Sequence, residues 1–170
     1  MNENEILSEM RFDPARGALL YRDVRYLLVR PETLRDVQKA AEEVLGRERA
    51  GDLFFAGGRT GGLLSSRRFK EAFGLSDREA AEFMCRMGAR IGWGAMLLLE
   101  FDPADRRLVV EVQGSPFAAT YGPSKSGVCH LTRGVMSGLA EGLFGGSVEA
   151  SETFCQSRGD ACCRFEVRGT

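Results

Sequence analysis

The stretch CHLTRGVMSGLAEGLFGGSVEASETFCQSRGDACCRFEV, residues 129–167, carries the pattern that decides the fold. It opens with a Cys-His pair and continues through a segment with glycine at every fourth position, at Gly134, Gly138 and Gly142. Two β-rich runs follow on either side of a Gly159-Asp160 turn, and three of the five cysteines of the chain are gathered there. The pattern predicts a helix followed by a β-hairpin, with thiols collected at its turn.

The composition is that of an ordinary globular domain, which we take to be a single unit over residues 1–170. Hydrophobic residues make up 44%, charged residues 28%, and the net charge is −1, so no excess of positive charge points to nucleic acid. No apolar run approaches the roughly 18 residues that cross a bilayer, and the first ten residues do not resemble a signal peptide. We therefore expect a cytoplasmic protein with reduced thiols, and the odd number of cysteines also disfavours a disulfide framework.

Periodicity and turn signals predict alternating strands and helices along the chain. Strands are expected in a hairpin over 10–21, in an apolar run over 25–30, in a second hairpin over 95–101 and 107–113, and in the last two runs over 147–155 and 163–167. Helices are expected over 31–46, 51–73, 76–92 and 126–144, the third beginning with a Ser76–Glu79 capping box. This order indicates an α+β fold in which helices pack on a small, mainly antiparallel sheet.

Two glycine-rich segments invite a functional interpretation. FFAGGRTGG, residues 54–62, lacks the ending of a phosphate-binding P-loop, and we interpret it as a helix whose glycines permit close packing. In the helix over 126–144, His130 and the three spaced glycines share one face, and each mid-helix glycine costs about 1 kcal/mol relative to alanine. Either another backbone approaches this face closely, or the face leaves space for a ligand with His130 at its rim.

The cysteines admit a metal site as one reading and reduced core thiols as the other. Cys129 at a helix start, Cys155 at a strand end and Cys163 after the turn could converge on one ion, for which Zn²⁺ is the best match. A fourth ligand would be needed, and Glu152, Cys162 and His130 compete for that place. Glu152 meets a geometric objection, because residues three apart on a regular strand face opposite sides and share an ion only at a bulge or strand end.

The quoted signature resembles the closing motif of the 4-vinyl reductase domain family, with its Cys-His, glycine-spaced helix, Glu-x-x-Cys, Gly-Asp and Cys-x-Phe. Softer similarity extends upstream through RYLLVRPETL, GGRTGG, GWGAMLLLEFD and SPFAATYG. The resemblance implies the ligand-binding fold shared by nitric-oxide-signalling and Golgi-transport proteins. It also implies similarity to the aromatic-sensing domains of phenol-responsive activators, in which three cysteines and one glutamate hold zinc. Their motif falls here on Cys129, Glu152, Cys155 and Cys163, which leaves Cys162 outside the site.

The candidate lining of a ligand pocket is less specific, since the tryptophan and histidine that hold a phenolic hydroxyl in those sensors have no assignable match. We expect contributions from Trp93, Phe117, Tyr121, His130, Gly134 and Gly138, each of which plain packing would also explain. The leading hypothesis is a zinc-stabilised sensor module, not an enzyme, that binds a small hydrophobic or aromatic molecule and acts through a homodimer or a separate signalling partner.

Two alternatives stand beside this hypothesis. One is a vinyl reductase, or an accessory protein, in the metabolism of chlorophyll precursors, although no dinucleotide fingerprint supplies the reducing chemistry. The other is a protein–protein scaffold in which the glycine-spaced face serves only for packing. A zinc ion with four protein ligands would be structural, because no coordination position is left for water.

Overall fold

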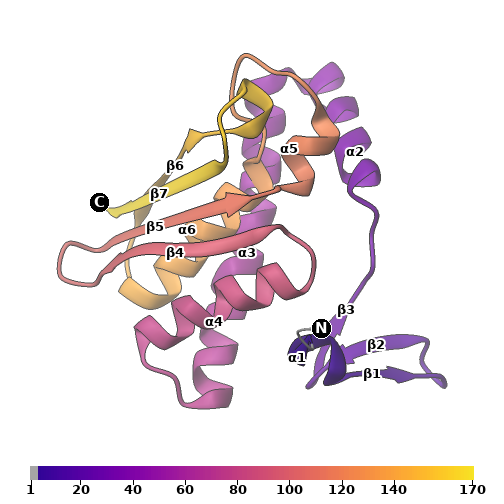
Figure 1. Ribbon diagram of the computed structural model, residues 1–170, viewed down its shortest axis with the longest axis vertical. Helices are drawn as coiled ribbons and strands as arrows, with labels where there is room; N and C mark the ends of the chain where they lie inside the picture. Colours follow the sequence, from indigo (N-terminus) through magenta and orange to yellow (C-terminus); the bar gives the residue numbers. More distant parts are fainter. Residues whose placement is uncertain (1–3) are drawn as a thin grey trace.

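The computed structural model describes residues 4–170, which form an α+β fold, as the sequence predicts (Figure 1). The helices are α1 (Glu5–Ser8), α2 (Pro31–Leu45), α3 (Arg47–Phe73), α4 (Asp77–Arg90), α5 (Pro116–Tyr121), α6 (His130–Phe144) and the 3₁₀ turn η1 (Gln156–Arg158). The strands are β1 (Met10–Asp13), β2 (Ala18–Tyr21), β3 (Val24–Tyr26), β4 (Ala95–Asp102), β5 (Arg107–Gln113), β6 (Val148–Phe154) and β7 (Cys163–Gly169).

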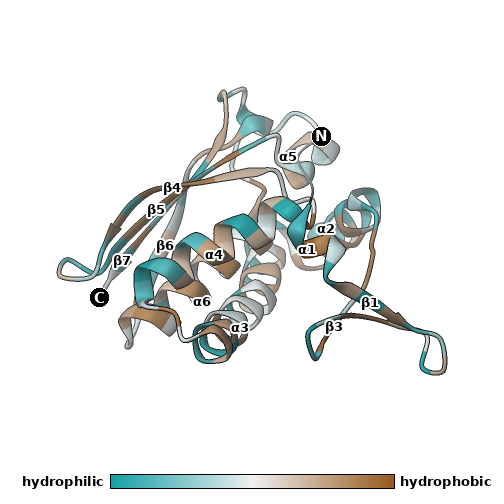
Figure 2. Ribbon diagram, turned by 60° about the horizontal axis from the view of Figure 1, so that its bottom comes forward, coloured by the Kyte–Doolittle hydropathy of each residue, from teal (hydrophilic) through white to brown (hydrophobic). Residues whose placement is uncertain are grey.

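The strands form two separate antiparallel sheets. The larger has the order β4-β5-β7-β6, and the smaller is the meander β1-β2-β3. Helices α4 and α6 pack on one face of the larger sheet, and α3 packs on the far side of α6, so this part of the molecule has three layers (Figure 2). The inward residues of β7, Cys163, Phe165 and Val167, alternate with more exposed ones, as expected for a sheet with one covered face.

The contact between α3 and α6 is made by glycine on both helices. A Cβ atom added at Gly58 would lie 2.1 Å from the carbonyl oxygen of Leu131, and one added at Gly138 would lie 2.0 Å from that of Arg59. Real Cβ atoms do not approach so closely, so only glycine lets these two backbones touch. The contact is flanked by an ion pair in which Arg59 donates to both carboxylate oxygens of Glu141, at 2.5 and 2.7 Å.

The N-terminal sheet lies at the opposite end of the molecule from the β6–β7 hairpin and packs on α3 and α4 through a second apolar cluster (Figure 1). Tyr21 and Phe69 are buried in it, with ring centroids 6.1 Å apart. Phe69 also packs against Phe73 and Phe83. This cluster fixes β1–β3 against the helices even though the chain crosses to α2 through an extended connection.

Three sequence expectations differ from the structure. The strand expected over 25–30 ends at Tyr26, because the chain beyond it has no neighbouring strand among the described residues. The helix expected from residue 126 begins at His130, so Cys129 is its N-cap residue. On α2, Val37 and Val44 belong to the predicted apolar face, yet both are exposed because α2 packs on the protein only through its other residues. The short helices α1 and α5 were not expected.

Candidate functional site

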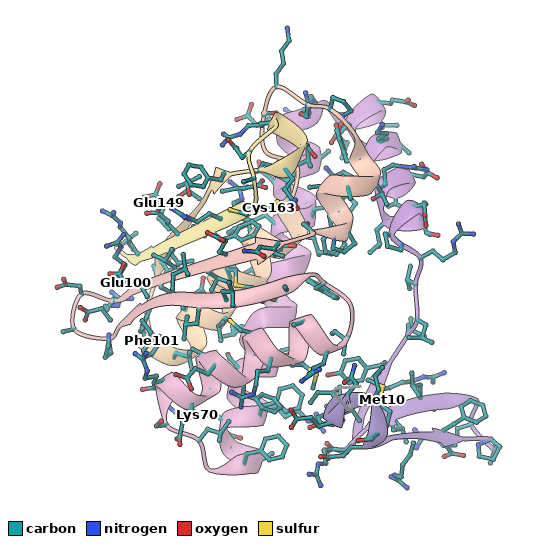
Figure 3. All side chains as sticks on the ribbon, in the orientation of Figure 1. Met10, Lys70, Glu100, Phe101, Glu149 and Cys163 are labelled. Atoms are coloured by element: carbon teal, nitrogen blue, oxygen red, sulfur yellow. The ribbon has the colours of Figure 1, made fainter. Side chains whose placement is uncertain are left out.

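Four side chains that the sequence singles out converge at one end of the larger sheet. Cys129 caps α6, Glu152 lies on β6, Cys155 follows that strand, and Cys163 begins β7, where Figure 3 labels it. One ligand atom from each of them lies within 4.8 Å of all the others. The three thiols are buried and none is in a disulfide. The arrangement offers three sulfur ligands and one oxygen ligand to a single ion.

A break in β6 brings Glu152 and Cys155 to the same side. The register between β6 and β7 shifts between Glu152 and Phe154, where the ladder has a β-bulge or similar irregularity, and the strand ends at Phe154. An extra residue in one strand changes the direction of the side chains beyond it. The geometric objection raised by the three-residue spacing is therefore met by the structure.

The spacing of the ligand atoms suits a tetrahedral ion. The sulfur atoms of Cys129 and Cys163 are 3.7 Å apart. Two thiolates at about 2.3 Å from a tetrahedral zinc ion would be about 3.8 Å apart. Glu152 Oε1 is buried and has no hydrogen-bond partner in the described part of the chain, whereas Oε2 accepts the backbone N–H of Cys129 at 3.1 Å. A free buried carboxylate oxygen beside three thiols is the chemistry of a cation site.

The protonation of the cluster indicates that it lacks positive charge. Hydrogen bonding between Cys129 and Cys155 raises the pKa of the first thiol and lowers that of the second. Burial raises the pKa of Glu152 to about 8. Metal ligands of these types bind in their deprotonated forms, so a divalent cation would compensate the charges that the protein alone leaves unbalanced.

Neighbouring groups hold the ligands in place. Asp160 accepts the backbone N–H of Cys155 at 2.7 Å and pairs with Arg158, and the backbone N–H of Gln156 lies 3.4 Å from the sulfur of Cys163. The pKa of Asp160 is lowered, first by the N–H of Cys155 and then by Arg158. Contacts of this kind orient metal ligands and tune their basicity. Asp160 belongs to the Gly-Asp turn of the signature, so the sequence did contain a signal for it.

Gly127 is a contributor that the sequence reasoning missed. A Cβ atom at this position would lie 2.4 Å from Glu152 Oε2, so glycine leaves room for the carboxylate. Ser115, which caps α5, was also missed, and its hydroxyl lies 3.6 Å from the sulfur of Cys129. No spacing rule identifies either residue, because each reaches the site from a distant part of the chain.

The two competing fourth ligands lie elsewhere. Cys162 precedes Cys163 on the chain and therefore points to the opposite face, toward Glu111. The ring of His130 packs against Gly51 of α3, and burial lowers its pKa. Neither belongs to the group of four.

A cavity of about 190 Å³ lies among α3, α4, α6 and β4. It is lined by Tyr26, Gly61, Ser65, Phe69, Met84, Met87, Gly88, Ile91, Trp93, Met96, Val135, Met136 and Leu139. None of these side chains is charged. The cavity is therefore apolar, with the hydroxyls of Tyr26 and Ser65 and the indole N–H of Trp93 as the polar side-chain groups of its lining.

Of the six residues expected to line a pocket, only Trp93 lines this cavity. Phe117 and Tyr121 border a space of about 10 Å³, which holds a water molecule at most. Gly134 and Gly138 face the backbone of α3, since a Cβ atom at either would meet a carbonyl oxygen at 2.0–2.1 Å. Of the two explanations for the glycine-spaced face, the structure favours backbone contact, and these glycines and His130 leave no space for a ligand.

Residues 108–169 match the family model of the vinyl-4-reductase domain. The chain therefore contains a vinyl-4-reductase domain. The match covers β5 to β7 and includes all four residues of the cysteine–glutamate cluster. The resemblance inferred from the sequence signature is confirmed. No curated protein matches this chain.

This vinyl-4-reductase-domain chain is similar in structure to proteins of several kinds. One is the phenol-responsive sensory domain of the transcription activator PoxR with phenol, at a TM-score of 0.85 and 21% identity, covering 97% of this chain and 87% of that one. A vinyl-4-reductase family protein from Methanocaldococcus jannaschii gives 0.58 and 16%, covering 85% and 83%. A trafficking protein particle complex subunit 3 from Naegleria fowleri, covalently bound to palmitic acid, gives 0.59 and 14%, covering 81% and 93%. At these identities the likeness establishes the fold. No helix in residues 4–170 has the length and apolar character needed to span a membrane.

Proposed function

We propose that this chain is a small-molecule-binding sensor module, which takes an uncharged apolar or aromatic molecule into the cavity beside Trp93. The cavity itself carries the proposal. Its volume of about 190 Å³ is similar to that of cavities that accept a single aromatic ring, for which about 150 Å³ is sufficient. The structural similarity to a phenol-responsive sensory domain supports the same class of ligand.

The lining of the cavity defines what it accepts. Burying an unpaired charge is costly, and no lining residue could compensate one, so a charged ligand is disfavoured. Met84, Met87, Met96 and Met136 supply flexible thioether side chains that adapt to ligands of different shape. The two hydroxyls and the indole N–H would hold one polar substituent of an otherwise apolar molecule.

We infer further that the metal of the cysteine–glutamate cluster is zinc and that Cys129, Glu152, Cys155 and Cys163 hold it. Three thiolates and a carboxylate suit a borderline ion in tetrahedral geometry. Because all four positions are filled by protein, the ion would stabilise the fold and leave no open position for chemistry. The ligand signal would then pass through a second copy of the chain or a separate partner in the cytoplasm.

The binding proposal is tested by the fluorescence of Trp93, which is the only tryptophan of the chain and lines the cavity. We expect phenol, toluene and naphthalene to change this fluorescence saturably and to raise the melting temperature. Benzoate, which has the ring of toluene but carries a charge, should do neither. Equal responses to toluene and benzoate, or none to any of the neutral compounds, would contradict the proposal.

Two glycines of α3 provide a matched pair of variants. Gly61 lines the cavity, Gly57 lies one turn earlier outside its lining, and a Cβ atom at either meets nothing within 4 Å. Gly61→Leu should fill the cavity and weaken binding of toluene at least about tenfold, whereas Gly57→Leu should bind as the unaltered protein does. Both variants should fold, because leucine favours a helix by about 1 kcal/mol over glycine. Equal binding by both would place the ligand elsewhere.

A further inference from the structure

The segment Leu27–Arg30, which connects β3 to α2, exposes three consecutive apolar side chains. Leu27 is 77% exposed, Leu28 86% and Val29 48%. The segment is extended and crosses from the small sheet to α2 without another described element on its outer side (Figure 1). Single exposed apolar residues are common on protein surfaces, but three in succession are unusual unless they serve an interaction.

The backbone of this segment is also unpaired. The N–H and C=O groups of Leu27, Leu28 and Val29 have no hydrogen-bond partner within residues 4–170. The segment continues directly from β3, which is the edge strand of the small sheet and pairs with β2 on one side only. An edge strand with free backbone groups and apolar side chains is a template for another extended chain.

The charges at the two ends of this edge indicate which chain would pair with it. Asp23 lies at its beginning and Arg30 at its end. In an antiparallel pair, the beginning of one strand lies beside the end of the other. Two copies of the same edge would therefore place Asp23 of each beside Arg30 of the other, forming two complementary pairs.

The present partners of these charges do not oppose such an arrangement. Asp23 pairs with Arg68, and Arg30 lies 3.4 Å from Glu32, but the side chains of Asp23 and Arg30 are largely exposed in both pairs. Exposed ion pairs contribute about 0–1 kcal/mol and rearrange easily. The edge can therefore exchange its present contacts for new ones at little cost.

We propose that residues 23–30 form a self-complementary interface, through which a second copy of this chain pairs in antiparallel orientation. The two small sheets then join across β3 into one continuous sheet. A groove of about 730 Å³, which the segment forms with Leu7, Met10 and Ile91, receives apolar side chains of the partner. The interface specifies the dimer that the proposed function invokes, but it requires neither the metal nor the ligand.

Light scattering during size-exclusion chromatography tests the interface on the full chain without ligand. The unaltered protein should elute as a dimer, and Leu28→Lys should elute as a monomer, because it places a charge at the centre of the paired edge. Val44→Lys is the matched control, since Val44 is 82% exposed on the outer face of α2. It should remain dimeric. A monomeric unaltered protein, or dissociation by Val44→Lys and not by Leu28→Lys, would overturn the proposal.

A charge exchange tests the orientation of the pair. Asp23→Arg alone places arginine beside arginine, and Arg30→Asp alone places aspartate beside aspartate, so each variant should be monomeric. An equimolar mixture should form a heterodimer, because both contacts then join like-for-like strands only in the homodimers: in the mixed pair one contact joins the two original residues and the other joins the two substituted ones.

The outcome of that exchange depends on which contact is counted, so the double variant is the decisive sample. Asp23→Arg combined with Arg30→Asp restores an arginine beside an aspartate at both ends of the pair and should recover the dimer. Single variants that remain dimeric, or a double variant that stays monomeric, would rule out antiparallel pairing of this edge.

Toluene binding measured on the same samples separates this inference from the proposed function. Monomeric Leu28→Lys that still binds toluene supports the interface and the cavity independently. A dimer that binds none of the neutral aromatic compounds retains the interface and removes the sensor proposal.

Discussion

Glu152 and Cys155 are three residues apart, yet both reach the same cluster because β6 changes register and ends between them. A regular strand would have pointed one of them away. At the scale of single residues, the site therefore depends on a local irregularity as much as on the choice of ligands. The buried carboxylate oxygen of Glu152, which has no partner among the described residues, is the clearest sign of what the cluster is built to hold.

Two adjacent cysteines distinguish a metal site from a thiol core. Cys163→Ser removes a ligand, and we expect the zinc content to fall from one per chain to near zero. The free energy of unfolding should fall by several kcal/mol, because metal binding contributes directly to folding. Metal analysis and denaturant titration measure both quantities.

Cys162→Ser is the control for this prediction. Cys162 is also buried but faces Glu111 outside the group of four. It should keep its zinc and lose about 1 kcal/mol or less, as expected for a small change at the edge of a core. Equal losses in the two variants would mean that the cysteines act only as packing residues.

At the scale of secondary-structure elements, α3 and α6 form the central contact of the molecule. Glycines on both helices remove the side chains that would separate them, so each backbone carbonyl lies close to the opposite helix. The cost of about 1 kcal/mol for each mid-helix glycine is offset by this packing. The same glycine-rich sequence that invited a phosphate-binding or ligand-binding interpretation is thus explained by helix packing.

An added methyl group tests this explanation. Gly138→Ala places a Cβ atom 2.0 Å from the carbonyl oxygen of Arg59, so the helices must separate. We expect a loss of about 3 kcal/mol in the free energy of unfolding, in the upper range for overpacking. Thermal or denaturant unfolding measures the difference.

Gly57→Ala serves as the comparison, because it lies on the same pair of helices but faces open space. This variant should be as stable as the unaltered protein, or more stable by up to about 1 kcal/mol, from helix propensity alone. If both variants had the same stability, the close approach of α3 and α6 would not be the reason for the glycines.

At the scale of the whole molecule, the cysteine–glutamate cluster joins parts of the chain that are distant in sequence. It connects the start of α6 to the end of β6 and the start of β7, and Ser115 adds α5 through its contact with Cys129. The ligand cavity lies closer to the other end, where α4 and the small sheet pack on α3. The fold thus keeps the stabilising centre apart from the site that would bind a ligand.

Removal of the metal should affect the whole fold. We expect a chelator to release one zinc ion per chain, to make three further thiols reactive and to lower the melting temperature by about 10 °C or more. Added zinc should restore all three quantities. A chelator that changes neither the thiol count nor the melting temperature would argue for a core of reduced cysteines.

The sequence by itself determined the types of the main elements and the residues of the cluster. The Ser76–Glu79 capping box, the hairpin of β4 and β5 and the helical spacing of α2 follow from local preferences that act within a few residues. Cys129, Glu152, Cys155 and Cys163 could be named because a motif with fixed spacing carries them. Local and motif signals of this kind survive without any knowledge of packing.

Only the tertiary structure decided where the empty space lies and which surfaces stay uncovered. Trp93 lines a cavity whereas Phe117 and Tyr121 do not, because helices and strands from four parts of the chain enclose that space. The glycine-spaced face of α6 could have met a ligand or another backbone, and the position of α3 settles it. The exposed edge at Leu27–Arg30 exists because no strand within residues 4–170 lies beside it. Cavities and free edges arise from what surrounds a residue, and neighbours brought together from distant segments leave no mark in the local sequence.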